Sequence, residues 1–447
     1  MGKKVALHNL GCKVNAYETE AMQEMLEEVG YTIVPFKEGA DVYVINTCTV
    51  TNIADRKSRQ MLHRARKMNP DAIVVATGCY VQAQAEQGEI DSCIDIVIGN
   101  NKKKDLIPIL EHFFAEKEGR VSQEVAEEEN EHNSLQMQEV IDINHTHEYE
   151  ELHLTKTGEH TRAYIKVQDG CNQFCTYCII PFARGRVRSR SMEHVLEEVR
   201  ELASHGYKEV VLTGIHLSSY GIDLEDTDLL KLILAVHEVE GIERIRLGSL
   251  EPRIVTEEFA KTIASLPKMC PHFHLSLQSG CNETLRRMNR RYSAEEYFEK
   301  CELLRKYFEH PALTTDVIVG FPGETEEEFE ESYAFVDKVD FYETHIFKYS
   351  RRAGTKADRM PDQIPEQKKA ERSACMIAMG ENKQKAYEAF FQGKQVEVLF
   401  EEKITLEGKE YWVGHTKEYM KVAMESDKNL VNELVTVELG VEAKIIH

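Results

Sequence analysis

The sequence contains no apolar run that approaches the roughly 20 residues needed to cross a membrane. Its first ten residues carry two lysines but no long apolar stretch, so we expect no signal peptide. Both features exclude membrane and secreted classes and predict a soluble, cytoplasmic protein. In a reducing cytosol the eleven cysteines are expected to bind metal or pack in the interior, not to form disulfides.

Positive charge is also scarce. The chain has 55 Lys and Arg against 77 Asp and Glu, a net charge of −22, which argues against broad, nonspecific binding of polyanions. Residues 115–160 hold 13 acidic and 3 basic residues, a net of −10, without sustained periodicity. We therefore expect an acidic linker over residues 116–160. A local cluster of arginines at 184–190 still permits a localised polyanion site.

The apolar pattern predicts an α/β protein of two or three domains. Residues 1–115 alternate β-branched runs with helical patterns, which predicts an N-terminal doubly wound parallel sheet. The expected strands are Val5–Leu7, Val42–Ile45, Ile73–Ala76 and Ile94–Ile98, and the expected helices are Glu18–Val29 and Ala54–Lys67.

Residues 161–375 resume this alternation with six strand–helix units, which predicts a central open (β/α)6 partial barrel. The chemistry of such a barrel lies at the carboxyl ends of its strands. The expected strands are Ala163–Val167, Val210–Thr213, Arg244–Gly248, His272–Leu277, Thr315–Val319 and Thr344–Phe347, with helices that include Met192–His205 and Ala294–Tyr307.

The C-terminal segment, residues 376–447, changes its period from helical to alternating. A long helix is expected over Glu366–Phe391, followed by a small β-barrel of the oligonucleotide-binding type. Its expected strands are Val396–Phe400, Tyr411–His415, Lys421–Ala423, Leu434–Glu438 and Glu442–Ile446.

Three cysteines at spacing C-x3-C-x2-C follow the first strand of the expected barrel: Cys171, Cys175 and Cys178. Three thiolates are one short of the four that usually hold a cubane iron–sulfur cluster, so one iron would keep an open position. A zinc site is the alternative, but zinc favours paired C-x2-C knuckles that complete four ligands. The spacing therefore favours a catalytic cluster.

Cys12, Cys48 and Cys79 each stand where an expected strand of the first sheet ends. Because the carboxyl ends of parallel strands meet at one edge, we expect these cysteines to converge as a second set of three metal ligands. The alternative is that each is a small buried hydrophobe. The other five lack partners at ligand spacing and are expected to serve packing: Cys93, Cys270, Cys281, Cys301 and Cys375.

Taken in order, the motifs resemble the methylthiotransferase family of radical S-adenosylmethionine (SAM) enzymes over nearly the whole chain. They are GC-x-x-N, INTC and GC in the first domain, and GCNQFCTYCIIPFARGRVRSR, LSLQSG and TDVIVGFPGET in the barrel. The C-terminal region is similar to the family's TRAM domain, which binds RNA. One departure is Cys281, where the family usually has serine. The wording LGCKVNAYETE resembles the threonylcarbamoyladenosine branch.

The resemblance implies a transferase with two [4Fe-4S] clusters and S-adenosyl-L-methionine as cofactors. Cys171, Cys175 and Cys178 would hold the radical-generating cluster, and Cys12, Cys48 and Cys79 the sulfur-carrying one. The implied reaction is methylthiolation of C2 of N6-threonylcarbamoyladenosine at tRNA position 37, next to the anticodon, giving 2-methylthio-N6-threonylcarbamoyladenosine. The sulfur donor and the electron donor stay unidentified. The alternatives are isopentenyladenosine in tRNA, an aspartate of a ribosomal protein, or an iron–sulfur RNA-binding protein without turnover.

Further residues are placed by the same resemblance and by their positions after strands. Cofactor contacts are expected from Phe174, Tyr177, Gly214, Arg246, Gln278, Ser279, Gly320 and Gly323. Loop packing, a tight turn at the glycines and a structural salt bridge at Arg246 are the alternatives. Contacts with a tRNA anticodon stem-loop are expected from Arg184, Arg186, Arg188, Arg190, Tyr411 and Tyr419.

Overall fold

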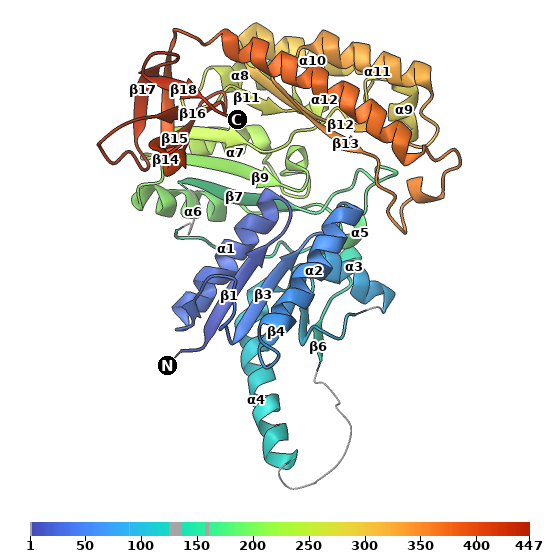
Figure 1. Cartoon of the computed structure of the whole chain (residues 1–447), viewed down its shortest axis with the longest axis vertical. Coiled ribbons are helices and arrows are strands. Elements are labelled where there is room, and N and C mark those ends of the chain that lie inside the picture. The colour runs from blue at the N-terminus through green and yellow to red at the C-terminus, as the bar shows by residue number, and fades with distance from the viewer. Residues whose placement is uncertain (1, 89, 125–135, 157–160) are drawn as a thin grey trace. The chain divides into compact units, whose positions relative to one another are not determined.

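The computed structural model describes residues 2–88, 90–124, 136–156 and 161–447, and their path is traced in Figure 1. The chain forms two compact units. The first contains residues 1–156 with 168–172 and 178–190, and the second contains 157–167, 173–177 and 191–447. No helix among these described residues is long and apolar enough to cross a membrane.

The first unit is built on a six-stranded sheet in the order β2-β1-β3-β4-β5-β6, and every neighbouring pair is parallel. This order reverses between β1 and β3, which is the point where open α/β sheets bind their ligands. The strands are β1 (Lys4–Asn9), β2 (Thr32–Ile33), β3 (Val42–Thr47), β4 (Ile73–Gly78), β5 (Ile96–Ile98) and β6 (Met137–Glu139).

Helices cover both faces of this sheet, which confirms the doubly wound prediction. On one face α1 (Lys13–Glu28) and α4 (Leu106–Glu124) bury apolar side chains such as Met22 and Leu110 against the strands. On the other, α2 (Asn52–Met68) and α3 (Cys79–Gln87) do the same. The short elements are η1 (Lys103–Asp105), η2 (Ile143–His145), α5 (Ile180–Ala183) and β8 (Arg188–Ser189).

The segment that we expected to be an acidic linker is partly regular. Helix α4 continues to Glu124, past the expected end of the first domain at residue 115, and β6 adds a parallel edge strand to β5. The remainder of the expected linker includes residues 125–135 and 157–160, which lie outside the described residues. The sequence pattern therefore did not predict β6, because this acidic segment has no sustained periodicity.

The second unit contains the predicted partial barrel. Its strands form two sheets, β10-β9-β7 and β11-β12-β13, linked by bridges Ile245↔Met269 and Leu250↔Leu275. The last two residues of β7, and β8, which pairs with them antiparallel, belong to the first unit. The strands are β7 (Arg162–Asp169), β9 (Glu209–Gly214), β10 (Arg244–Leu247), β11 (His272–His274), β12 (Ala312–Val319) and β13 (Glu343–Lys348).

Except for the short helix Asn282–Arg287, each barrel helix begins where a polar side chain accepts a hydrogen bond from one of its first backbone N–H groups. Ser191 caps α6, and α10 and α11 begin with complete capping boxes at Ser293 and Thr325. The helices are α6 (Met192–Ser204), α7 (Leu229–His237), α8 (Glu257–Ala264), α9 (Asn282–Arg287), α10 (Ala294–Tyr307), α11 (Glu326–Val339) and the turns η3 (Leu217–Ser219), η4 (Pro252–Ile254) and η5 (Ala357–Arg359).

Helix α12 (Glu366–Ala389) is confirmed, and it crosses residue 375, where we expected the barrel domain to end. The C-terminal strands form one antiparallel sheet in the order β17-β14-β15-β16-β18. They are β14 (Gln395–Leu406), β15 (Lys409–Thr416), β16 (Lys421–Met424), β17 (Leu434–Glu438) and β18 (Ala443–Ile445). Their core continues onto α12 through Tyr387.

Gly78 is a position that only glycine can occupy. Its φ of +96° and ψ of −165° lie in a region closed to other residues, and a Cβ would stand 2.5 Å from both Asn46 Oδ1 and the Thr47 carbonyl oxygen. We expect Gly78→Ala to lower the free energy of unfolding of the first unit by at least about 2 kcal/mol.

Gly88, at the other end of α3, is the matched control, because its φ of +71° carries a backbone penalty without a neighbour within 4 Å. Urea unfolding by far-UV circular dichroism measures both variants. Trp412, the only tryptophan, reports the C-terminal sheet separately through its fluorescence. Equal losses in Gly78→Ala and Gly88→Ala would contradict the steric argument.

Candidate functional site

Three cysteines of the first unit lie at the carboxyl ends of adjacent strands and near helix N-termini. Cys12 follows β1 and is the N-cap of α1, Cys48 follows β3, and Cys79 follows β4 as the first residue of α3. Helix N-termini favour negative charge, so they suit thiolates. Cys48 and Cys79 are buried and Cys12 is exposed, which gives the group one open side.

Hydrogen bonds and close packing hold the loops of these cysteines together. The buried Asn15 amide donates to the Leu10 carbonyl oxygen at 2.8 Å and to the Thr47 carbonyl oxygen at 3.0 Å. Gly11 packs so closely that a Cβ there would lie 3.0 Å from Cys48 Sγ. Cys48 interacts electrostatically with both Cys79 and Cys12. The expected convergence of three thiols therefore has a structural basis.

Burial, together with the neighbouring thiol of Cys79, raises the pKa of Cys48 to about 12. Crowded buried thiols resist ionisation unless a cation replaces their protons. Three soft sulfur donors with one open side fit an iron–sulfur cluster that keeps an exchangeable position.

The fully buried Arg184 is the centre of the polar network beside these cysteines. Its Nε donates to Cys79 Sγ at 3.1 Å, and its Nη1 donates to both Glu18 Oε1 and Asp169 Oδ2, at 2.8 and 3.0 Å. A further donation reaches Asn15 Oδ1 at 2.7 Å. Burial lowers the pKa of Arg184, but Asp169, Cys79 and Glu18 more than offset this effect and hold it above its usual value.

Two further groups support this network. Lys103 Nζ, also fully buried, lies 3.3 Å from Glu18 Oε2 and donates to Asn100 Oδ1 at 2.8 Å. The Asn100 amide lies 3.7 Å from Cys79 Sγ. N–H donors directed at a sulfur stabilise its thiolate and tune a bound cluster.

The expectation that Arg184, Arg188 and Arg190 offer surface charge to phosphates is therefore wrong. All three are at most 2% exposed. Arg188 lies 3.9 Å from Asp169 Oδ2, and Arg190 Nε donates to Glu151 at 2.8 Å. Arg186 is half-buried, so its role in RNA binding stays a prediction.

The loop of Cys171, Cys175 and Cys178 passes from the first unit through the second and back. On the first-unit side, Cys171 N–H donates to the Gly185 carbonyl oxygen at 3.0 Å. On the second-unit side, Thr176 donates to backbone oxygens of Arg287 and Met288. Cys171 and Cys175 are buried and Cys178 is half-buried.

Arg290 was missed as a site residue, because in sequence it belongs to a basic run. Its NH1 donates to Cys175 Sγ at 3.3 Å, and its Nε donates to Tyr292 Oη at 2.9 Å. His216, two residues beyond β9, was also missed. Burial, Arg290 and Arg253 lower the pKa of His216 to about 4, so its imidazole is neutral at neutral pH. The roles of Arg290 and His216 follow only from their neighbours in the folded protein, so no pattern in the sequence indicates them.

The expected cofactor residues occupy the carboxyl ends of the barrel strands. Gln278 holds a left-handed φ of +71° with its N–H bonded to the Asp316 carbonyl oxygen at 2.9 Å, a strained position of the kind found at functional sites. Ser279 is buried, and Gly214 ends β9 half-buried. Phe174 is 38% exposed with a φ of +51°. Their contacts with cofactor stay predictions.

Three other expected cofactor residues have structural partners. Tyr177 packs edge-on to Phe321 with ring centroids 6.3 Å apart. Gly320 N–H donates to Glu324 Oε2 at 2.6 Å, and a Cβ there would lie 2.3 Å from Lys369 Cγ. Gly323 N–H donates to the Asp362 carbonyl oxygen at 2.9 Å. The backbone N–H groups of these glycines thus serve the turn, although other contacts with a cofactor stay predictions.

The expected roles of Arg246 and Tyr419 are wrong. Arg246 is fully buried, with its Nε bonded to Glu209 at 2.8 Å, which is the structural salt bridge considered as the alternative. Tyr419 stacks between His272 and His415, with centroids 4.9 and 4.7 Å away, so no ring face is left for a base. Lys444 Nζ lies over the ring of Tyr411, 4.2 Å from its centroid, and stacking of a base on Tyr411 stays a prediction.

Comparisons with known proteins agree with this arrangement. Residues 165–336 match the model of the radical SAM superfamily, and residues 4–99 match one described as uncharacterized protein family UPF0004. In fold, the chain is similar to the radical SAM methyltransferase TsrM from Kitasatospora setae, with a TM-score of 0.54 and 16% identity over 80% of this chain and 74% of that one. The central fold is thus that of a radical SAM protein.

Two relatives narrow the class. Threonylcarbamoyladenosine tRNA methylthiotransferase MtaB from Bacillus subtilis is 40% identical over 437 residues, 97% of this chain and 93% of its own. The tRNA-2-methylthio-N(6)-dimethylallyladenosine synthase from Thermoanaerobacter pseudethanolicus is 37% identical over 98% of this chain and 91% of its own. The chain belongs to the radical SAM methylthiotransferase family.

Loss of the Arg184 guanidinium should destabilise the first unit. Arg184→Gln leaves Glu18 and Asp169 without this buried partner, and we expect the free energy of unfolding to fall by about 3–5 kcal/mol. Arg56→Gln, on the exposed side of α2, should change it by less than about 0.5 kcal/mol. Urea unfolding of the metal-free, reduced protein measures both, and similar small effects would contradict the structural role.

Proposed function

We propose that the protein is a tRNA methylthiotransferase that modifies C2 of N6-threonylcarbamoyladenosine at position 37, beside the anticodon. The observation that carries this proposal is the pairing of two cysteine triplets with near full-length similarity to relatives of that name. One triplet lies at the switch point of the first sheet, and the other follows the first barrel strand. Because its proposed substrate is tRNA, we expect the enzyme to act in the cytoplasm.

The choice of substrate rests on the similarity to the MtaB proteins. Those from Bacillus subtilis and Aquifex aeolicus are both 40% identical to this chain. The dimethylallyladenosine synthase from Thermoanaerobacter pseudethanolicus is 37% identical, so isopentenyl-bearing adenosine is the second candidate. The motif LGCKVNAYETE favours the first.

Two [4Fe-4S] clusters fit the two triplets. Cys12, Cys48 and Cys79 would hold one, and Cys171, Cys175 and Cys178 the other. Together with SAM these groups supply the radical that removes hydrogen from an unactivated C–H bond and the sulfur that replaces it. External sulfur and electron donors are required.

The chain's own residues orient and protect these groups. Arg184 and Asn100 direct N–H groups at Cys79, and Arg290 directs one at Cys175, which fixes the positions of these sulfurs. Phe174 and Tyr177 lie between the cysteines of this loop in sequence and would exclude water from the reacting atoms. Neutral His216 adds no charge beside Arg290.

RNA binding must rely on local contacts, because the net charge is −22. We infer that an anticodon stem-loop presents its single-stranded bases to the barrel opening, where no duplex has to be opened. Arg186 and Tyr411 are the remaining candidates for contacts, since Arg184, Arg188, Arg190 and Tyr419 are committed to packing.

The substrate is tested by mass spectrometry of tRNA nucleosides. Deletion of the gene should remove 2-methylthio-N6-threonylcarbamoyladenosine and leave N6-threonylcarbamoyladenosine at its position. Loss of the 2-methylthio derivative of isopentenyladenosine instead would select the second candidate. Unchanged methylthio nucleosides, together with loss of a methylthiolated ribosomal aspartate or with no change in any modification, would refute a tRNA function.

The two triplets should be separable by substitution. Cys175→Ala should abolish reductive cleavage of SAM, measured as release of deoxyadenosine. Cys48→Ala should retain part of this cleavage but abolish methylthiolation of a stem-loop carrying threonylcarbamoyladenosine. Cys375→Ala, at an exposed cysteine of α12, is the control and should retain both. Intact methylthiolation by Cys48→Ala would refute the assigned role of the first unit.

A further inference from the structure

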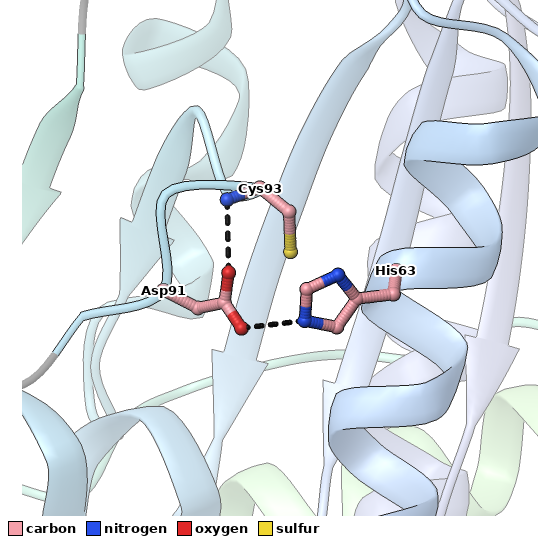
Figure 2. Close-up of side chains that lie close together, drawn as sticks. All are labelled: His63, Asp91 and Cys93. Carbon is pink, nitrogen blue, oxygen red and sulfur yellow. Dashed lines mark hydrogen bonds and ion pairs between the residues drawn. The ribbon is translucent and has the colours of Figure 1, made fainter.

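A third group of metal-ligand side chains lies in the first unit, away from the cysteine triplet (Figure 2). His63 projects from α2, and Asp91 and Cys93 come from the loop between α3 and β5. One ligand atom of each lies within 4.8 Å of the others. From the sequence, Cys93 was expected to serve packing, because it lacks partners at ligand spacing.

We propose that His63, Asp91 and Cys93 bind one zinc-type divalent cation. Thiolate, imidazole and carboxylate are the three donor types that zinc accepts, and three protein ligands with an open fourth position form a common zinc arrangement. Ligand atoms around a tetrahedral zinc are about 3.5 Å apart. Small rotations of the side chains would meet that spacing, because all three separations are already at most 4.8 Å.

Contacts among the three side chains and their loop already hold the donor groups close to one another. Asp91 Oδ1 accepts from Cys93 N–H at 3.0 Å, and Asp91 Oδ2 lies 2.8 Å from His63 Nε2. Figure 2 shows the Cys93 sulfur directed toward the imidazole ring. Arg66 fixes the loop from behind by donating to the Cys93 carbonyl oxygen at 3.1 Å. These contacts preorganise the three ligand side chains for binding a cation.

The exposure of the three side chains gives the cation a route and a fourth ligand. Cys93 is 8% exposed and Asp91 21%, whereas His63 is 60% exposed. Binding would replace the thiol proton of Cys93 and leave the outer position to water. The cation would join α2 to the loop before β5, so it would stabilise the first unit, independently of the proposed reaction.

Zinc binding is measured on the full-length protein after its clusters have been loaded anaerobically. One equivalent of zinc is added, unbound metal is removed, and zinc and iron are counted by mass spectrometry. We expect one zinc per chain that is retained by His112→Ala, an exposed helical histidine paired with Glu116. His63→Ala and Cys93→Ser should bind zinc more than about tenfold more weakly, with unchanged iron.

Cobalt identifies the ligands. Cobalt added in place of zinc should give a thiolate-to-cobalt charge-transfer band that Cys93→Ser abolishes. Because Cys93 is buried, His63→Ala decides the matter if Cys93→Ser folds poorly, since His63 lies on an exposed helix surface. A wild-type protein without stoichiometric zinc, or a His63→Ala protein that binds zinc as tightly as wild type, would overturn the site.

Discussion

The buried guanidinium of Arg184 is the interaction on which the first site depends. It joins Glu18 of α1, Asp169 at the end of β7 and the sulfur of Cys79 at the start of α3. Removing such charges from water costs several kcal/mol per ion unless every partner is in place. We therefore expect the three segments to adopt their positions cooperatively. They meet at the edge of the sheet where Cys12 and Cys48 follow β1 and β3.

Local patterns were sufficient to predict the fold and the proximity of the three cysteines of the first sheet. Alternation of β-branched runs with helical periods predicts parallel strands, and the loops after such strands share one edge wherever the strands pair. This logic placed Cys12, Cys48 and Cys79 together without knowledge of the strand order. It failed for β6, because a strand of three residues inside an acidic segment has too few apolar positions to be recognised.

The direction of long polar side chains was not predictable, because their partners are remote in sequence. Arg184 pairs with Glu18 across 166 positions and Arg190 with Glu151 across 39, so a run that reads as a basic surface is buried. Tyr419 and Arg246 were misassigned for the same reason, since His272 and Glu209 decide their environment. The spacing of cysteines in the sequence also gave no sign that Cys93 lies beside His63 and Asp91, because only the fold brings these side chains together.

Both units direct an arginine at a cysteine sulfur, Arg184 at Cys79 and Arg290 at Cys175, with distances of 3.1 and 3.3 Å. These cations belong to the basic runs that a nucleic-acid binder would be expected to expose. Arg184 is fully buried, Arg290 is half-buried, and both donate to sulfur, so less positive charge remains for the surface of a chain that is already acidic. Recognition of RNA must then come from shape and a few local contacts, since the net negative charge of the chain repels any polyanion at long range.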